Sequence, residues 1–229
     1  MEIIWDWNGT LFDDVSTGPA ILNRMLAKRE KPPLRDLDHY REIFQFPVEN
    51  YYRAAGLDFS SESFESMAAD YIALYPMESQ NCGLAEGAKE ALEAFRQAGF
   101  RQNILSVSEQ GLLESQLKKF SIEGYFSHVI GQKDGYAVGK TERGLQWLRE
   151  EGIPPEDCVL IGDTDHDAQT AKKLGCRCVL LACGHQSRER LQRTGAAVVG
   201  TLWEAVQFVL DVKIMRAAHL PSGRERSLL

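Results

Sequence analysis

The spacing of apolar residues divides the chain into three regions. A short apolar run over residues 2–7 ends at an Asn-Gly pair and predicts a buried strand that leads into a turn. Between about Ser16 and Tyr75 the apolar residues recur at helical spacing, which predicts about four helices and no strand. After Gly83, short apolar runs alternate with helical patterns. We therefore expect one strand, a block of helices, and a longer region in which strands and helices alternate.

The alternating region predicts a parallel sheet. Its expected strands are residues 103–107, 128–130, 158–161, 178–181 and 197–199, and its expected helices are residues 86–98, 112–120, 141–151, 168–174, 188–193 and 202–210. Strands that alternate with helices favour right-handed crossovers, and the first strand must join the same sheet. We therefore predict an α/β fold with a doubly wound, Rossmann-like sheet of five or six strands. Residues 1–13 and 84–229 would form this core, and residues 14–83 an inserted all-helical cap.

Composition and charge narrow the classes of protein. The chain has 229 residues, and 33 acidic against 26 basic side chains give a net charge of −7. A sequence-independent nucleic-acid binder needs a basic face, so we expect no nucleic-acid partner. No run of eighteen apolar residues and no export-signal pattern is present, so we expect no membrane span and a cytoplasmic location. The last residues, 219–229, lack a helical period and are expected to be a frayed end.

The cysteines indicate reduced thiols rather than a disulfide framework. They are odd in number, and the first eighty residues contain none; they are Cys82, Cys158, Cys176, Cys178 and Cys183. The last three are close in sequence, but no CxxC pair or neighbouring histidine motif completes a metal site.

Reactive side chains follow several of the predicted strands. Asp6 ends the first apolar run, Ser106 lies near the end of the second strand, and Asp163 and Asp167 follow residues 158–161. Lys140 opens the helix before that last strand. In an open parallel sheet, ligands bind beyond the carboxyl ends of the strands. Several acids, a hydroxyl and an ammonium group should therefore converge at one edge.

These residue types suit phosphoryl chemistry. A carboxylate such as Asp6 can attack phosphorus, and Asp163 with Asp167 can hold a hard divalent cation. Ser106 and Lys140 can bind phosphate oxygens. Taken singly, Asp6 could cap a loop and Lys140 could be a solvated helix start, but their joint order favours a site. The backbone N–H groups of Gly9 and Thr10 can add an anion-binding concavity.

Two motifs resemble those of a known superfamily. Asp6 to Asp13, DWNGTLFD, resembles the first motif, DxDGTLxD, of the haloacid dehalogenase superfamily, and residues 162–167, GDTDHD, resemble its fourth motif, GDxxxD. Ser106 and Lys140 match the second and third motifs, with Ser106 preferred to Ser108 because of its spacing to the Tyr-Phe pair at 125–126. Thr141 replaces the proline usual after the lysine. The resemblance covers roughly residues 2–210 and is to the phosphoglycolate-phosphatase-like branch, which has a helical cap.

This resemblance implies a Mg²⁺-dependent phosphatase that acts on a small phosphorylated metabolite. Asp6 would form an aspartyl-phosphate. Mg²⁺ would be held by Asp6, the backbone carbonyl of residue 8 and Asp163, with Asp167 supporting that shell. Ser106 and Lys140 would bind the phosphoryl group, and the cap would close over the site.

Residue 8 departs from the family pattern. The family's second aspartate, which protonates the leaving oxygen and then activates water, is Asn8 here. An amide does neither, so aryl or acyl phosphates, which leave as weak bases, should be better substrates than alkyl phosphates. Asp13, Asp14, Glu109 and His185 are the candidate replacements.

Other readings stay open. A weakened member would bind phosphorylated ligands or protein partners without efficient turnover. A carbon–halogen hydrolase is disfavoured by Asp163 and Asp167, and a phosphonate-cleaving relative would need a cap lysine, for which only Lys28 and Lys31 are at hand. We expect Arg41, on the cap, to bind a second anionic group of the substrate, although a solvated helix face is the alternative. The substrate and the oligomeric state are left open.

Overall fold

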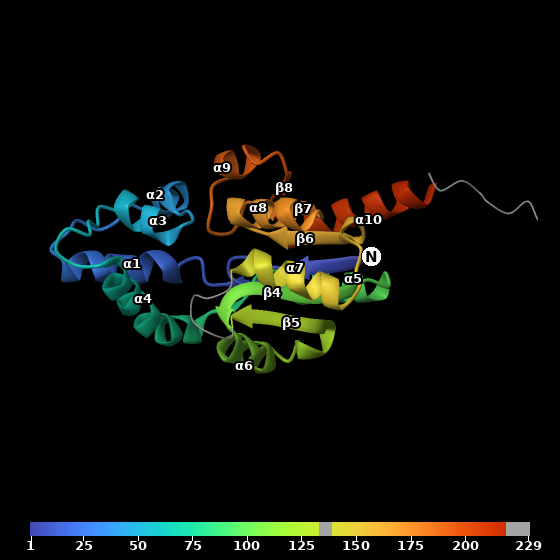
Figure 1. Cartoon of the computed structure of the whole chain (residues 1–229), viewed down its shortest axis with the longest axis horizontal. Helices are drawn as coiled ribbons and strands as arrows, with labels where there is room; N and C mark the ends of the chain where they lie inside the picture. Colours follow the sequence, from blue (N-terminus) through green and yellow to red (C-terminus); the bar gives the residue numbers. More distant parts are fainter. Residues whose placement is uncertain (133–138, 219–229) are drawn as a thin grey trace, which may run out of the picture.

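The computed structural model describes residues 1–132 and 139–218 (Figure 1). The predicted frayed end, residues 219–229, lies outside the described part of the chain. No helix among the described residues is both long and apolar enough to cross a bilayer.

The described residues form the predicted parallel sheet, with six strands in the order β5-β4-β1-β6-β7-β8. The strands are β1 (Glu2–Trp5), β4 (Arg101–Glu109), β5 (Phe126–Gln132), β6 (Cys158–Gly162), β7 (Arg177–Leu181) and β8 (Ala197–Val199). β1 lies between β4 and β6 and is parallel to both. The lone first strand therefore joins the sheet, as expected, and lies at its centre, although it ends at Trp5 rather than at residue 7.

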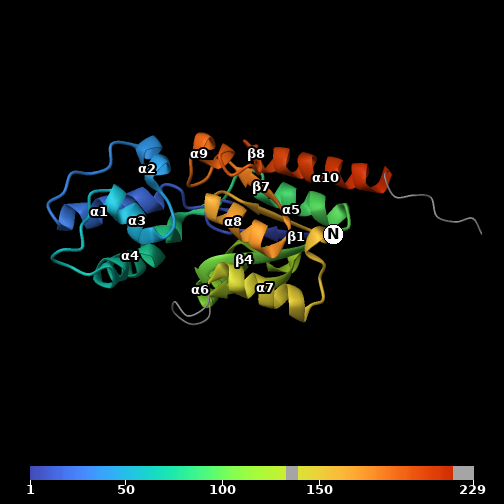
Figure 2. The ribbon, with the colours of Figure 1, turned by 45° about the horizontal axis from the view of Figure 1, so that its top comes forward.

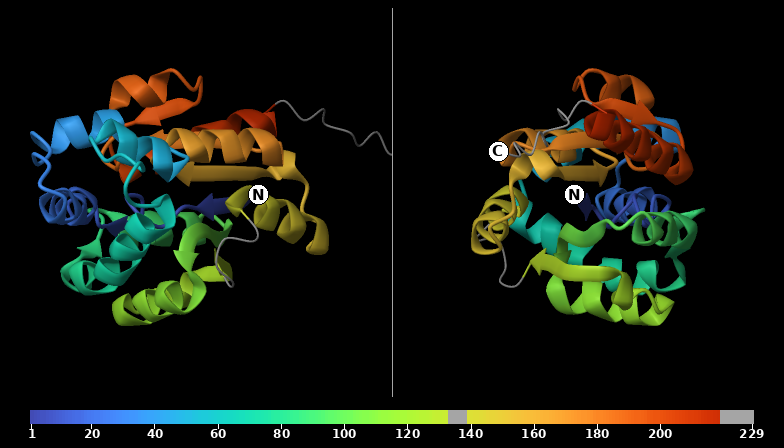
Figure 3. Two further views of the ribbon diagram at one scale, coloured as in Figure 1. Left: turned by 60° about the vertical axis from the view of Figure 1, so that its left-hand side comes forward. Right: turned by 90° about the vertical axis from the view of Figure 1, so that its right-hand side faces the viewer.

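Helices cover both faces of the sheet, as the end-on view in Figure 3 shows. Those of the core are α5 (Ala88–Gln97), α6 (Gln110–Phe120), α7 (Lys140–Glu150), α8 (Asp165–Leu174), α9 (Arg188–Gln192) and α10 (Leu202–Ala218), with 3₁₀ turns at Glu123–Tyr125 and Pro155–Asp157; a further 3₁₀ turn, Ser79–Asn81, lies before β3 (Gly83–Leu84). α5, α6 and α10 pack on the face that carries Ile3 and Trp5. α7 and α8 pack on the opposite face, with Ile4. Because successive side chains of a strand point to opposite faces, β1 supplies both cores.

The segment between β1 and α5 contains the four predicted helices, α1 (Thr17–Lys28), α2 (Leu37–Ile43), α3 (Val48–Ala54) and α4 (Phe64–Glu78). Their apolar faces form a separate core. The chain enters and leaves this cap through an antiparallel pair, β2 (Phe12–Asp13) and β3 (Gly83–Leu84). Two-residue strands are too short to show a period, so the pattern of apolar residues does not predict them. The expected division at residues 13/14 and 83/84 falls on this pair.

The cap lies beyond the carboxyl ends of the strands. The arrowheads of β5 and β6 point toward α1–α4 in Figure 1, and the turned view in Figure 2 shows the same arrangement. Ligands bind at this edge of an open parallel sheet. The residues that follow β1, β4 and β6 therefore face the cap.

Candidate active site

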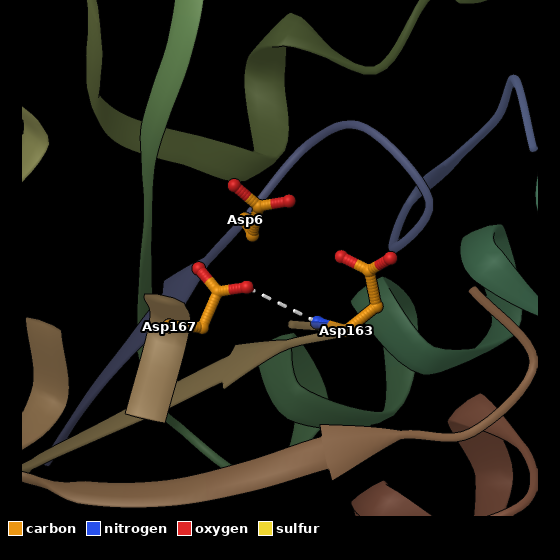
Figure 4. Close-up of side chains that lie close together, drawn as sticks. All are labelled: Asp6, Asp163 and Asp167. Carbon is orange, nitrogen blue, oxygen red and sulfur yellow. Dashed lines mark hydrogen bonds between the residues drawn. The ribbon is translucent and has the colours of Figure 1, made fainter. Parts of the chain in front are cut away.

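Three buried carboxylates meet at the centre of this edge. Asp6 follows β1 directly, Asp163 follows β6, and Asp167 lies in the first turn of α8. One oxygen from each carboxylate lies within 4.8 Å of the other two. Figure 4 shows the three side chains gathered at the strand ends. The proximity follows from the register, since β1 and β6 are hydrogen-bonded neighbours.

The start of α8 fixes the orientation of Asp167. Thr164 caps the helix, and one oxygen of Asp167 accepts hydrogen bonds from the Thr164 hydroxyl at 2.7 Å and backbone N–H at 3.0 Å. The Asp163 N–H donates to the same oxygen at 3.3 Å (Figure 4). Such a capping box satisfies helix donors that would otherwise be orphaned. The second oxygen of Asp167 is left to bind Lys140.

Lys140 joins two of the carboxylates. Its Nζ donates to Asp6 Oδ1 at 2.5 Å and to Asp167 Oδ1 at 2.6 Å, and its side chain is only 2% exposed. Burial works to lower the pKa of Lys140, but the charges of Asp167 and Asp6 outweigh it and hold the pKa above its usual value. Lys140 is therefore a charged member of the cluster, and the alternative of a solvated helix start is wrong.

Replacing Lys140 with Ala should destabilise the protein as well as impair activity. Removing one partner of a buried ion pair leaves the other charge uncompensated, which costs roughly 3–5 kcal/mol. Lys118→Ala, at the exposed end of α6, should change stability by less than about 0.5 kcal/mol. Urea unfolding of the metal-free variants measures both free energies. Equal stability of the two variants would contradict the buried ion pairs.

The cluster carries more negative charge than its own cation balances. Burial raises the pKa of Asp6 to about 6, against the attraction of Lys140, and raises that of Asp163 to about 8. When all are ionised, three carboxylates and one ammonium leave two negative charges. The donors are all oxygen atoms, the ligands that Mg²⁺ prefers. The arrangement thus fits a divalent cation in both charge and ligand type.

The family model of the haloacid dehalogenase-like hydrolases matches residues 3–181, which include all three carboxylates and Lys140. The chain belongs to this family.

The chain is also similar to curated proteins and to solved structures. Phosphoglycolate phosphatase of Pseudomonas savastanoi pv. phaseolicola is 22% identical over 237 positions, which cover 97% of this chain and 86% of that protein. Tyrosine-protein kinase PtkA of Mycobacterium tuberculosis is 28% identical over 204 positions, which cover 86% and 67%. The crystal structure of a predicted phosphatase from Clostridium acetobutylicum superposes with a TM-score of 0.74 at 20% identity, covering 92% of this chain and 98% of that one. A haloacid dehalogenase-like family hydrolase from Streptococcus pneumoniae gives a TM-score of 0.73 at 21% identity, covering 91% and 97%. At these identities the two structures establish the fold.

In this haloacid dehalogenase-like hydrolase, the loop after β1 packs closely against Asp163. Gly9 has a φ of +67°, and a Cβ there would lie 2.3 Å from Asp163 Oδ2. Only a glycine allows that approach. Asp163 also accepts hydrogen bonds from the His185 N–H at 2.6 Å and from Thr10 Oγ1 at 3.4 Å. Gly9 and the Thr10 side chain therefore position Asp163.

The backbone donors of this loop are used within it. The Gly9 N–H donates to Asp14 Oδ1 and to the Phe12 carbonyl, both at 2.9 Å, and the Thr10 N–H donates to the Trp7 carbonyl at 3.3 Å. The structure does not bring these two donors to the carboxylates, so it lends no support to their expected role in binding an anion.

Every polar atom of the Asn8 side chain has a partner. Its Nδ2 donates to Asp14 Oδ2 at 2.8 Å and to the Tyr75 hydroxyl at 2.5 Å, and its Oδ1 accepts from Ser108 Oγ at 2.6 Å. Tyr75 in turn donates to Asp14 Oδ2 at 2.6 Å. The surroundings of residue 8 therefore suit an amide, because its NH₂ group donates to the carboxylate of Asp14, which a second carboxylate could not do.

One of the four candidate replacements, Asp14, lies beside Asn8, and a second, His185, contacts Asp14. His185 Nε2 lies 3.2 Å from Asp14 Oδ1. Burial works to lower the pKa of His185, but Asp14 outweighs it and raises that pKa to about 9. Glu109 instead caps α6 by accepting from two of its N–H groups, and Asp13 is exposed on β2.

The structure places Ser108 rather than Ser106 at the site. Ser108 lines the cavity that contains Asp6 and Lys140, and it bonds Asn8. Ser106 is fully buried, is not among the residues lining that cavity, and accepts a hydrogen bond from the Ser108 N–H at 3.1 Å. The sequence contained a usable signal, because Ser108 lies closer to the carboxyl end of β4 than Ser106 does.

Arg41 is also not among the residues that line the cavity with Asp6 and Lys140. Its guanidinium donates to the carbonyls of Gly184 at 3.0 Å and Cys183 at 2.9 Å, so it ties α2 to the loop after β7. Lys28 and Lys31 pair with the cap residues Asp70 and Asp58. The structure does not bring these three cations to the site.

Proposed function

We propose that this hydrolase is a Mg²⁺-dependent phosphatase that acts on a small phosphorylated compound through an aspartyl-phosphate on Asp6. The observation that carries the proposal is the buried set of Asp6, Asp163, Asp167 and Lys140, joined by hydrogen bonds at the carboxyl edge of the sheet. The relationship to phosphoglycolate phosphatases supports the same reaction class.

Each residue has a part in the proposed reaction. Lys140 orients Asp6 and offers positive charge to the phosphoryl oxygens. An oxygen of Asp6 attacks phosphorus, the bond to the leaving oxygen breaks, and water later releases phosphate and restores the carboxylate. Asp6, Asp163, Asp167 and the backbone carbonyl of Asn8 would hold Mg²⁺. When bound, Mg²⁺ offsets the repulsion between the carboxylates and the phosphate dianion.

Mg²⁺ should stabilise the protein more at pH 8 than at pH 5. Because the pKa values of Asp6 and Asp163 are raised to about 6 and about 8, the metal-free folded chain binds protons that the unfolded chain has lost. Its stability therefore falls as pH rises from about 4 to about 8. Mg²⁺ at a hundred times its Kd adds about 2.7 kcal/mol, or about 5–10 °C in Tm for a chain of this size. At pH 5, protons compete with the metal and the gain shrinks.

Thermal unfolding with Mg²⁺ and with EDTA measures this difference. Asp163→Asn should abolish the shift, whereas Asp165→Asn, which alters the neighbouring carboxylate that pairs with Arg190, should keep it. A shift that is the same at both pH values would refute the carboxylate site.

The function itself is tested by phosphate release. Acetyl phosphate is a suitable first substrate, since its leaving group needs no acid. Release that requires both Mg²⁺ and Asp6 supports the phosphatase. A second function, binding of phosphorylated ligands without turnover, is favoured by Asn8 and is indicated if ligands bind and no phosphate appears.

A further inference from the structure

A cavity of about 310 Å³ extends from the carboxylates into the cap. Asp6, Lys140 and Asp163 lie at one end of it. The rest of its lining comes mainly from α2, α3, α4 and the segment between α2 and α3. A phosphoryl group bound at Asp6 would therefore place its leaving group against the cap.

The cap side of this cavity is rich in aromatic rings. It includes Tyr40, Phe44, Phe46, Tyr51, Phe64 and Tyr71. Phe44 meets Phe46 and Tyr51 edge to face, at ring-centre distances of 5.6 and 5.1 Å. Val48 and Val107 add aliphatic surface. Flat apolar groups bind favourably among rings in such orientations.

The positive groups that line the cavity are already engaged. Lys140 is held by Asp6 and Asp167. The ring of His185 contacts Asp14 through Nε2 and the Tyr40 hydroxyl through Nδ1, at 3.2 and 2.7 Å.

The other basic side chains near the cavity are a histidine that contacts an aromatic ring and an arginine that binds backbone carbonyls. His166, the remaining basic side chain of the described lining, packs its ring on Phe46 at 4.7 Å. Arg41 binds backbone carbonyls outside the cavity. The described lining therefore offers a carboxylate on the leaving group no lysine or arginine other than the paired Lys140, and burying an unpaired charge is costly.

The chemistry of Asn8 points to the same kind of leaving group through a separate observation. Its amide cannot protonate the departing oxygen. A phenol ionises like tyrosine, with a pKa of about 10, whereas the pKa of an alcohol is far higher, in the range of water. A phenolate therefore departs without an acid far more readily than an alkoxide.

Building on the proposed phosphatase function, we infer that the substrate is an aryl phosphate whose leaving group is uncharged and apolar. Asp6 forms the new bond to phosphorus, the bond between phosphorus and the aryl oxygen breaks, and that oxygen leaves with the electron pair and takes a proton from water. A second water then attacks phosphorus, the bond to Asp6 breaks, and inorganic phosphate departs.

Four substrates separate the two features of the leaving group, its aromatic character and its lack of charge. Acetyl phosphate is the reference compound, because its leaving group needs no acid. The kcat/KM for phenyl phosphate should exceed that for cyclohexyl phosphate, whose leaving group has a similar size but departs as an alkoxide. It should also exceed the values for 4-carboxyphenyl phosphate, which is aromatic but charged, and for phosphoglycolate, which is charged and alkyl. We expect kcat/KM for phenyl phosphate to be about 100-fold above that for phosphoglycolate.

The outcomes distinguish this inference from the proposed function. If acetyl phosphate is hydrolysed but phosphoglycolate or 4-carboxyphenyl phosphate matches phenyl phosphate, the phosphatase stands and the substrate class is wrong. If no phosphate is released from any compound, both proposals fail as statements of catalysis. Binding by calorimetry with Mg²⁺ gives an independent check, in which benzylphosphonate should bind at least tenfold more tightly than phosphonoacetate. Equal or reversed affinities overturn the apolar class.

Two phenylalanines of the cap give a matched pair of variants. Phe46 lines the cavity, whereas Phe59 packs on Arg53 and Phe64 and is not among the lining residues. Phe46→Ala should lower the ratio of kcat/KM for phenyl phosphate to that for acetyl phosphate by about tenfold or more, and Phe59→Ala should leave the ratio unchanged. An unchanged ratio in Phe46→Ala, with a native-like Tm, would show that the aromatic wall does not bind the leaving group.

Discussion

Replacing Asp6 with Asn should lower kcat for any phosphate ester by roughly 10⁴-fold or more, because the amide removes the proposed nucleophile. The fold should survive. Burial disfavours the ionised form of Asp6, and Lys140 keeps Asp167 as a partner in the variant. We therefore expect the metal-free Tm to stay within about 4 °C of the native value, which corresponds to about 1 kcal/mol.

The matched control is Asp13→Asn. Asp13 lies seven positions along the same motif but is exposed on β2, so its replacement should leave turnover unchanged. Phosphate release and covalent ³²P labelling, each with and without Mg²⁺, measure the two variants. Labelling of the Asp6→Asn protein at native levels would show that the phosphoryl group is carried elsewhere.

The sheet and the carboxylate cluster were predictable from sequence because their determinants are local. The alternation of apolar runs and helical patterns predicts a parallel sheet, and Asp6, Asp163 and Asp167 each adjoin a strand end. Because β1 and β6 are neighbouring parallel strands, the carboxylates that follow them lie close together. Lys140 was placed correctly for the same reason, since it begins the helix before β6.

The parts that were not predicted depend on long-range contacts or on irregular pairing. Asp14 and His185 are 171 positions apart, and no periodicity links them. The spacing in sequence to residues 125–126 favours Ser106 over Ser108. The pairing of β4 with β5 shifts register between Leu105 and Glu109, so that spacing does not decide which serine lies at the site. Arg41 looked free in the sequence because the carbonyls that it binds follow β7, far along the chain.

The native enzyme should show a burst with an aryl phosphate. Without a carboxylate at residue 8, release of the phenol is less impaired than attack of water on the aspartyl-phosphate. The aspartyl-phosphate should therefore accumulate. Stopped-flow detection of the phenol should give about one equivalent per site, followed by a slow steady rate. Because Asn8-Gly9 is prone to deamidation, peptide mass spectrometry must first show that residue 8 is intact.

The variant Asn8→Asp tests this explanation, but the structure shows that it needs a compensating change. An aspartate at residue 8 would place a carboxylate where Asn8 Nδ2 now lies 2.8 Å from Asp14 Oδ2. Two such charges repel by about 4 kcal/mol at 4 Å and an effective dielectric constant of 20, so one of them would bind a proton. The single variant should therefore gain little activity near neutral pH and should lose stability.

The double variant Asn8→Asp, Asp14→Asn restores one carboxylate and one amide with their places exchanged. We expect it to remove the burst and to raise the steady rate by about 10²–10⁴-fold, the usual contribution of a positioned acid–base group. Asp14→Asn alone, measured beside it, controls for the loss of the contact between Asp14 and His185. If the double variant keeps the burst and the slow rate, the low rate does not arise from the missing carboxylate at residue 8, and another group already supplies and accepts the proton.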